Sequence, residues 1–307
     1  MPDFKKSNLI PLVSVIVPVY NDSESLKKCI QALEYQTYCK DYYEIIIVDN
    51  NSEENLELVV SQFPNIRYIK ELKRGSYAAR NKGLTIAKGD IIAFTDSDCI
   101  PAHDWLEKGA SILQNNPNCG LVGGKIELYF QNEAKPTPIE LYEKVSAFPQ
   151  EKYVQERQFG VTANLFTRRS VLEQVGCFKS TLKSGGDREW GLRVSKAGYQ
   201  LIYSQGVCVK HPARKSWSEL HTKIVRQTSG MLDVASLNQK SDDRFATFLN
   251  WIAYLAPSPR ITYLILTEPS INSLSKKVQT FLIMLLVKLF RGVELFRIIV
   301  KLRQKEY

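Results

Sequence analysis

The chain has 307 residues, of which 44% are hydrophobic and 24% are charged. This is ordinary globular composition, which excludes extensive disorder and leaves room for one large α/β domain with a smaller helical appendage. The formal net charge of +9 favours polyanionic partners, but it does not choose among nucleic acids, anionic lipids and phosphorylated substrates.

The first hundred residues alternate between strand and helix patterns. The β-branched run 13–19 predicts a buried strand, and residues 23–36 carry apolar side chains at helical spacing. The same alternation continues in five further segments: a strand at 44–49, a helix at 53–63, a strand at 66–69, a helix at 77–87 and a strand at 90–95. The sequence therefore predicts an α/β fold with a mainly parallel sheet and helices on both faces.

The rest of the chain is less regular. Strands are predicted at 121–130 and 200–209, a helix is predicted at 187–197, and 136–149 is a proline-containing stretch. We expect a catalytic domain over 1–244, with a nucleotide half at about 1–120 and an acceptor half at about 121–244. A helical, basic and amphipathic region is expected over 245–307.

The C-terminal region combines apolar and basic residues. Residues 270–307 contain eight Lys and Arg against two Glu, and the longest apolar run, 281–287, is far shorter than the roughly 20 residues of a spanning helix. We expect helices that lie on an anionic membrane surface. The alternative is a helix packed against the catalytic domain or in a dimer interface.

Location follows from two observations. The six cysteines form no CxxC pair or zinc spacing, and residues 1–12 contain no apolar stretch of signal-peptide length. We expect reduced thiols and a cytoplasmic protein, peripheral at the inner face of the plasma membrane.

Polar residues follow three predicted strands. Asn21, Asp49 and Asp96 lie at or just after their carboxyl ends, which is where ligands of open α/β sheets bind. Asp96 and Asp98 form a DxD motif, whose hard oxygen atoms suit Mg²⁺ or Mn²⁺ bound together with substrate phosphates. Arg80 adds a cation for a diphosphate. Each residue has a plainer alternative, since Asn21 and Asp49 are good helix N-caps, the DxD motif suits a turn, and Arg80 fits a helix surface.

Four segments in this order, PVYNDSESLKKCIQAL, IIIVDNNSEEN, GSYAARNKGLTIAKGDIIAFTDSD and GGDREWGLRVSKAGY, resemble family 2 glycosyltransferases of the GT-A fold. The resemblance covers about residues 13–230. It implies an inverting, metal-dependent transfer from a nucleoside-diphosphate sugar, usually a UDP-sugar. It also implies the roles of six nucleotide-binding residues: Pro18, Tyr20, Asn21, Asp49, Arg80 and Asp96.

The same resemblance implies the metal and acceptor residues. Asp98 would be the direct metal ligand, together with Asp96, and His211 would be a further metal or diphosphate contact. Asp187 would be the base that activates the acceptor hydroxyl. The family often has Glu where this chain has Gly186, which leaves Glu189 as the alternative base. Asp187 is also a good N-cap for the following helix.

Rival functions are weaker. A nucleotidyltransferase or P-loop enzyme would need a glycine-rich loop after the first strand, a nucleic-acid-binding protein would need a binding motif, and a processive synthase would need QxxRW and spanning helices. None of these patterns occurs in the sequence. We expect no nucleic-acid partner and a lipid-linked or glycan acceptor, in cell-envelope or extracellular polysaccharide or glycolipid synthesis. The remaining alternative is a non-catalytic GT-A domain that binds nucleotides or acts as a scaffold. The sequence does not predict the oligomeric state.

Overall fold

The computed structural model describes residues 10–237 and 256–303. The domain boundary predicted at 244 lies outside the described residues. The chain divides into two compact units, each assembled from separate segments. The first unit comprises Met1–Ile126, Gln150–Ser180 and Asp187–Lys210, and the second comprises Glu127–Pro149, Thr181–Gly186 and His211–Tyr307.

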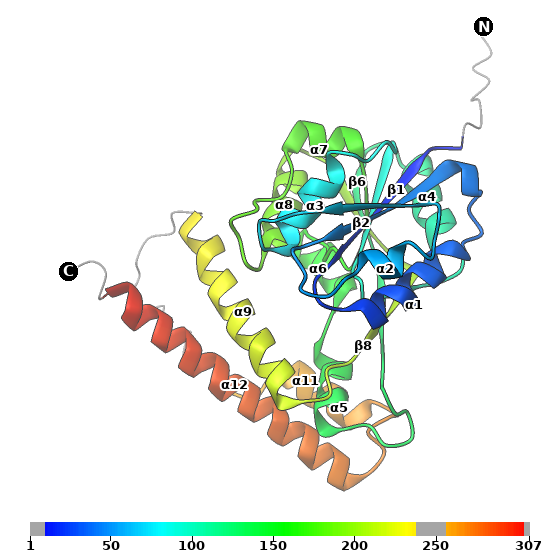
Figure 1. The fold of residues 1–307 in the computed structure, drawn as a ribbon. Helices are drawn as coiled ribbons and strands as arrows, with labels where there is room; N and C mark the ends of the chain where they lie inside the picture. Colours follow the sequence, from blue (N-terminus) through cyan, green and yellow to red (C-terminus); the bar gives the residue numbers. More distant parts are fainter. Residues whose placement is uncertain (1–9, 238–255, 304–307) are drawn as a thin grey trace, which may run out of the picture. The chain divides into compact units, whose positions relative to one another are not determined.

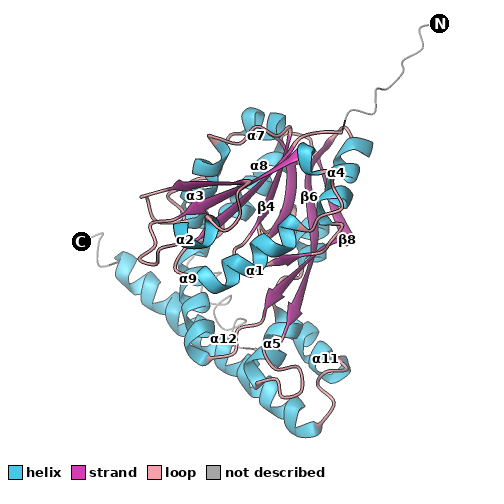
Figure 2. Cartoon of the chain, turned by 45° about the vertical axis from the view of Figure 1, so that its right-hand side comes forward, coloured by secondary structure: helices cyan, strands magenta, loops and turns pink. Residues whose placement is uncertain are grey.

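An eight-stranded sheet in the order β3-β2-β1-β4-β7-β6-β8-β5 forms the centre of the first unit (Figure 2). Its first four strands run parallel: β3 (Ile66–Lys70), β2 (Tyr43–Asp49), β1 (Val13–Val19) and β4 (Ile91–Thr95). Every residue of β1 and β4 is buried. These are the four strands that the apolar runs predict, because a strand covered on both faces needs a continuous apolar sequence.

The other half of the sheet is antiparallel wherever its pairing is described. β7 (Asn164–Arg168) pairs with β4 and with β6 (Cys119–Tyr129), and β5 (Ile100–Pro101) pairs with β8 (Gln200–Pro212). The sheet is therefore mixed, with its parallel part confined to the nucleotide half. The sequence pattern does not predict β7, the strand that joins the two parts.

Helices lie on both sides of this sheet (Figure 1). α1 (Ser23–Glu34) is capped by Asp22 and buries one apolar side, and α3 (Ser76–Leu84) packs Gly83 against Ile16 and Val48. α2 (Glu57–Val60) is much shorter than the helix predicted at 53–63. The remaining helices of this unit are η1 (Lys40–Tyr42), α4 (Trp105–Asn115), α6 (Gln150–Arg157), α7 (Arg169–Val175) and α8 (Gly186–Lys196), the last of which begins in the second unit.

The second unit is helical. Its described helices are α5 (Pro138–Ser146), α9 (Trp217–Leu237), α11 (Pro259–Thr267) and α12 (Leu274–Arg303). α9 and α12 run side by side (Figure 1). Six buried side chains form their common core: Tyr142, Leu220, Ile224, Ile265, Met284 and Val287. In the part of the chain that the structure describes, no helix has both the length and the apolar character needed to cross a membrane.

Candidate functional site

The carboxyl ends of the parallel strands bring the predicted nucleotide-binding residues to one edge of the sheet. Val19, the last residue of β1, pairs with Asp49, the last residue of β2. Asn21 and Asp96 follow β1 and β4 by two and one residues. Because all three strands are parallel, their ends meet at the same edge, and a ligand there is within reach of all three loops.

Asn21 connects two of these loops. It adopts a left-handed backbone conformation, with φ of 47°, which Asn tolerates better than most residues. Its Oδ1 atom accepts from the Glu53 N–H at 2.8 Å, and its own N–H donates to Ser52 Oγ at 3.0 Å. Asp22, rather than Asn21, caps α1. Asn21 therefore fixes the loop after β1 to the loop after β2.

Asp49 is buried and already partnered. Its Oδ1 accepts from the Ser52 N–H at 2.9 Å, and its Oδ2 accepts from the Tyr68 hydroxyl at 2.7 Å. Burial, followed by the hydrogen bond to Asp49, raises the pKa of Tyr68, so this phenol remains a donor. Two neutral donors hold the carboxylate in one orientation while each oxygen keeps a second acceptor position.

An exposed aromatic ring lies beside these residues in the sequence. Tyr20 is 44% exposed, and the Arg74 guanidinium lies 5.3 Å from the centre of its ring. Pro18 instead lies buried within β1, opposite Val48. Of the predicted β1 residues, Tyr20 therefore offers an accessible face, whereas Pro18 belongs to the sheet.

Arg80 is buried and forms an ion pair with Asp96. It occupies the same side of α3 as Tyr77, three residues earlier, and its guanidinium lies 5.8 Å from the centre of the Tyr77 ring. Its side chain is 4% exposed, whereas that of Asp96 is 34% exposed. Within the described residues, Arg80 Nε is buried without a hydrogen-bond partner. Arg80 is therefore not the surface residue of the plainer alternative.

Two hydrogen bonds to the Asp96 carbonyl anchor the turn that carries the DxD motif. The Cys99 N–H donates to the Asp96 carbonyl at 3.1 Å, and the buried Cys29 Sγ donates to the same carbonyl at 3.6 Å. Burial, followed by the negative charges of Asp98 and Asp96, raises the pKa of both thiols. Both cysteines are therefore neutral thiols. The carboxylates of Asp96 and Asp98 provide hard oxygen atoms that fit Mg²⁺ or Mn²⁺.

Asp187 lies in the first turn of α8. Its Oδ1 accepts from the Thr162 hydroxyl at 3.0 Å, and its backbone N–H donates to the Tyr77 hydroxyl oxygen at 3.3 Å. Burial raises the pKa of Asp187, although Arg80 and Thr162 lower it in part. A carboxylate with a raised pKa, still partly exposed to solvent, is a suitable proton acceptor.

Glu189, the alternative base, is held in ion pairs. Arg193 donates to both of its oxygens, from Nε at 3.0 Å to Oε1 and from Nη2 at 3.0 Å to Oε2. Lys179 also contacts Oε1 at 2.9 Å. Both oxygens of Glu189 are thus engaged by cationic side chains, so an acceptor hydroxyl would have to compete with Arg193 and Lys179 for them.

His211 is the penultimate residue of β8 and belongs to the second unit. It is buried, its Nδ1 lies 2.7 Å from the Pro212 carbonyl oxygen, and its ring lies 4.8 Å from that of Phe148. The preceding residue, Lys210, pairs with Ile100 of β5. The metal-binding role of His211 stays a prediction.

Comparisons with known proteins identify the family of the chain. Residues 14–180 match the family model described as Glycosyl transferase family 2. The chain belongs to glycosyltransferase family 2. It is 38% identical over 251 residues to Glycosyltransferase AglE of Haloferax volcanii, covering 80% of this chain and 81% of that protein. It is 25% identical over 301 residues to the Glucosyl-dolichyl phosphate glucuronosyltransferase of the same organism, covering 88% and 91%.

A solved structure carries the same fold. The mannosyltransferase PcManGT from Pyrobaculum calidifontis, in complex with GDP-Man and Mn²⁺, has a TM-score of 0.62 and 21% identity, and the match covers 94% of this chain and 88% of that one. The chain thus has the GT-A fold, as its resemblance to family 2 glycosyltransferases implies, and it is a glycosyltransferase.

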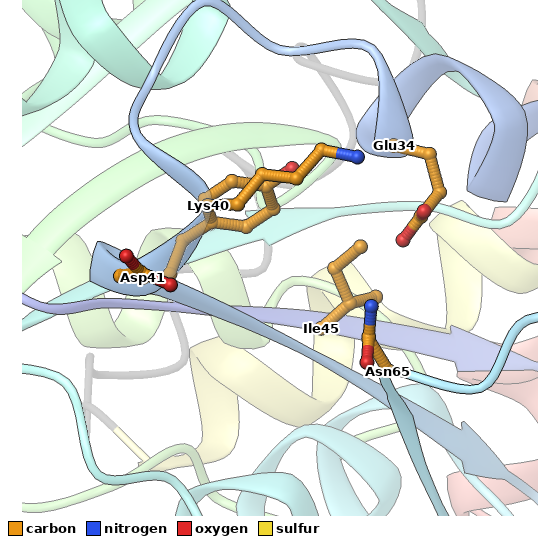
Figure 3. A pocket seen from close by; sticks show the side chains of 6 residues that line it. Glu34, Lys40, Asp41, Ile45 and Asn65 are labelled. Atoms are coloured by element: carbon orange, nitrogen blue, oxygen red, sulfur yellow. The ribbon is translucent and has the colours of Figure 1, made fainter.

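A hollow of about 260 Å³ lies elsewhere in the first unit of this family 2 enzyme (Figure 3). It is lined by Glu34, Lys40, Asp41, Tyr43, Ile45 and Asn65. Tyr43 begins β2, whereas Asp49 ends it, so six strand steps of about 3.3 Å each separate the hollow from the nucleotide edge. The hollow is therefore separate from the candidate site.

Three residues of the site were not identified from the sequence. Tyr77 has a recoverable signal, because it precedes Arg80 by three residues and so shares its side of a helix. Tyr68 lies on β3, two residues before the residue that pairs with Asp49, which becomes visible only once the strand register is known. Thr162 has no such signal, since it precedes the strand β7 that the sequence pattern does not reveal.

Proposed function

We propose that this family 2 glycosyltransferase transfers a sugar, with inversion, from a nucleoside-diphosphate sugar to the hydroxyl of a lipid-linked acceptor in cell-envelope glycan synthesis. The observation that carries the proposal is the arrangement around Arg80, which pairs with Asp96 and electrostatically lowers the pKa of Asp187 against the effect of burial. One buried cation thus connects the predicted donor-binding acid with the predicted base.

The donor half uses the strand ends. Tyr20 stacks on the base, Asp49 accepts hydrogen bonds from the base or ribose, and Asn21 holds the two loops in place. Asp98 and Asp96 hold a Mg²⁺ or Mn²⁺ ion, which neutralises charge on the diphosphate when bound; His211 is a further candidate ligand. Arg80 fixes the orientation of Asp96, and its unpartnered Nε supports a second role towards the diphosphate.

The acceptor half uses Asp187. Its carboxylate removes the proton of the acceptor hydroxyl as that oxygen attacks the anomeric carbon from the side opposite the diphosphate, which inverts the configuration. The Thr162 hydroxyl orients the carboxylate through its Oδ1 atom. The ion pairs of Glu189 favour Asp187 over Glu189 as this base.

A thermal-shift panel tests the donor proposal. UDP, GDP and other nucleoside diphosphates are each added with Mn²⁺, Mg²⁺ or EDTA to the wild type and to Asp98→Ala. One diphosphate at about 100 times its dissociation constant should add about 2.7 kcal/mol of stability, only with metal and only in the wild type. Lys108→Ala, which removes a half-exposed side chain paired with Asp104, is the control. The absence of any shift in the wild type would instead support a non-catalytic domain.

The acceptor class rests on the relatives. Two of them are named as enzymes of dolichyl phosphate-linked sugars, one from Haloferax volcanii and one, 25% identical over 229 residues that cover 70% of each chain, from Methanococcus voltae. Such substrates are anchored in a membrane, so their enzyme must work at its surface. The sequence prediction of a cytoplasmic, peripheral enzyme accords with this requirement.

The exposed side of α12 supports membrane association. Val278, Leu282, Leu286, Leu289, Val293 and Phe296 recur every three or four residues and are each 38–59% exposed. They form one stripe along the helix, which we call the α12 stripe. The opposite side, with Met284 and Val287, is buried in the helical core. An apolar stripe on a basic helix suits the headgroup region of an anionic bilayer.

Vesicle cosedimentation tests this association. The wild type should sediment with phosphatidylglycerol vesicles, and Leu282→Asp combined with Leu289→Asp should lower the bound fraction at least fivefold, because each change places a charge among lipid chains. Gln279→Asp, which is exposed beside the stripe, should have little effect. If the double variant sediments as well as the wild type, the stripe does not contact lipid; if it converts a dimer to a monomer in light scattering, the stripe is an interface between two copies.

A further inference from the structure

A buried carboxylate in the second unit is shared by two cations. Glu143 on α5 has a side chain that is 1% exposed. Its Oε2 lies 2.8 Å from Nη1 of Arg214, and its Oε1 lies 2.7 Å from Nζ of Lys223 on α9. The side chains of Arg214 and Lys223 are 20% and 13% exposed. We call Glu143, Arg214, Lys223 and Arg291 the basic cluster, for the reason that follows.

Arg291 brings a third positive charge from α12. Its charge lowers the pKa of both Lys223 and Tyr142, which places it close to the other members. Its Nη2 donates to Gln227 Oε1 at 3.2 Å, and among the described atoms its Nε is buried without a partner. Two cations therefore pair directly with the Glu143 carboxylate, and Arg291 adds a third positive charge next to Lys223.

Three further acidic side chains of this unit contact other groups. Glu140 accepts from the backbone of Gln131 and Thr137, Glu294 pairs with Arg297, and Glu219 accepts from the Lys215 N–H. These contacts do not neutralise the basic cluster. Buried charge that lacks a counter-charge is costly, so the cluster has a strong preference for an added anion.

The cost of the excess charge is visible in Lys223. Burial, followed by the charges of Arg214 and Arg291, lowers the pKa of Lys223 to about 8 against the opposing effect of Glu143. An anion bound here would raise the pKa of Lys223 again. The charged ammonium would in turn hold the anion more strongly. The Lys223 ammonium also lies 5.6 Å from the centre of the Phe148 ring. The backbone of Phe148 is left-handed, with φ of 48°.

Resting on the proposed function, we propose that the basic cluster binds the phosphate group of a polyprenyl-phosphate-linked acceptor. Guanidinium and ammonium groups form short, charge-assisted hydrogen bonds with phosphate oxygens, and the planar guanidinium matches two of these oxygens at once. Arg214 and Lys223 share Glu143 in the empty state, and Arg291 supplies the donor that has no protein partner.

The experiment measures binding to phosphatidylcholine vesicles that contain polyprenyl phosphate, and separately to vesicles with the same charge density of phosphatidylglycerol. Lys223→Gln and Arg291→Gln should each weaken binding to the polyprenyl phosphate vesicles at least tenfold, and leave binding to phosphatidylglycerol within twofold. Arg226→Gln is the matched control, since it removes an exposed positive charge from the same helix as Lys223 and should change neither. Lys223→Arg should retain binding and make it independent of pH between 7 and 9, whereas the wild type should lose affinity above about pH 8.

Each contrary outcome overturns the proposal. Unchanged binding by folded Lys223→Gln and Arg291→Gln would make the cluster a structural ion network only, and an equal loss on both kinds of vesicle would assign it to bilayer headgroups. Melting temperatures verify that the variants fold. The nucleoside diphosphate panel is independent: if it fails while polyprenyl phosphate binding depends on the cluster, the proposed donor chemistry is wrong and the phosphate site stands.

Discussion

Asp187→Asn is expected to lower kcat by roughly 10²–10⁴-fold, the usual contribution of a general base, with nucleoside diphosphate binding retained. The amide keeps the size of the carboxylate and its contact with Thr162, but it cannot accept the proton. Stability should not fall. Because burial raises the pKa of Asp187, its charged form is disfavoured on folding, and this cost is present above the folded-state pKa and relieved as the pH falls through it. A neutral amide removes the cost at pH 7.

Glu189→Gln is the matched control and should behave in the opposite way. It removes the negative charge that pairs with Arg193 and Lys179, so the melting temperature should fall while kcat stays within a few-fold of the wild type. The pH profile of kcat/KM of the wild type adds a second readout. Its acidic limb should lie above the pKa of an ordinary Asp, which is about 3.9. Near-full activity of Asp187→Asn together with inactive, folded Glu189→Gln would exchange the two roles.

Glu143→Gln is expected to lower the free energy of unfolding by about 3–5 kcal/mol, the usual cost of removing one partner from a buried ion pair. Arg214 and Lys223 would then lose the carboxylate that they share. Burial alone would raise the pKa of Glu143, but Lys223 and Arg214 more than offset it and lower the pKa. The stabilisation by Glu143 is therefore present above its unfolded-state pKa and lost as the pH falls through the folded one.

Urea denaturation at pH 7 measures this loss, with Glu24→Gln as the control. Glu24 forms an ion pair with Lys28 at 2.7 Å on the surface of α1, and its replacement should leave the denaturation midpoint unchanged. A Glu143→Gln midpoint equal to that of the wild type would show that solvent already screens the basic cluster, and the argument for a bound anion would lose its electrostatic basis.

The sequence predicts the parallel half of the fold well, because β1, β2 and β4 are continuous apolar runs that end in polar turns. It is wrong about the length of the helix after β2, since the polar residues 50–55 form turns and only Glu57–Val60 is α-helical. It does not reveal β7, because the five residues NLFTR contain only two consecutive apolar side chains between polar ones. In this chain the local sequence is enough to predict the parallel strands, whereas the antiparallel strand β7 depends on tertiary pairing.

The site follows the same division. Asp49, Asp96 and Asp187 are placed by strand ends and one helix start, which local sequence specifies. The partners of Arg80 and Glu189 are not, because an arginine on a predicted helix can face solvent, substrate or another side chain with equal local plausibility. The structure pairs Arg80 with Asp96 and Glu189 with Arg193. These ion pairs distinguish Asp96 and Glu189, which are held by arginine, from Asp187, the proposed proton acceptor.

The chain enters the second unit three times, at Glu127–Pro149, at Thr181–Gly186 and from His211 onward. No single cut of the polypeptide therefore separates the units. A fragment ending near residue 244 would keep Tyr142 and Leu220 but lose Met284 and Val287, which complete their core. In evolutionary terms, a single recombination event cannot exchange the helical unit between enzymes, because its three segments are interleaved with the first unit.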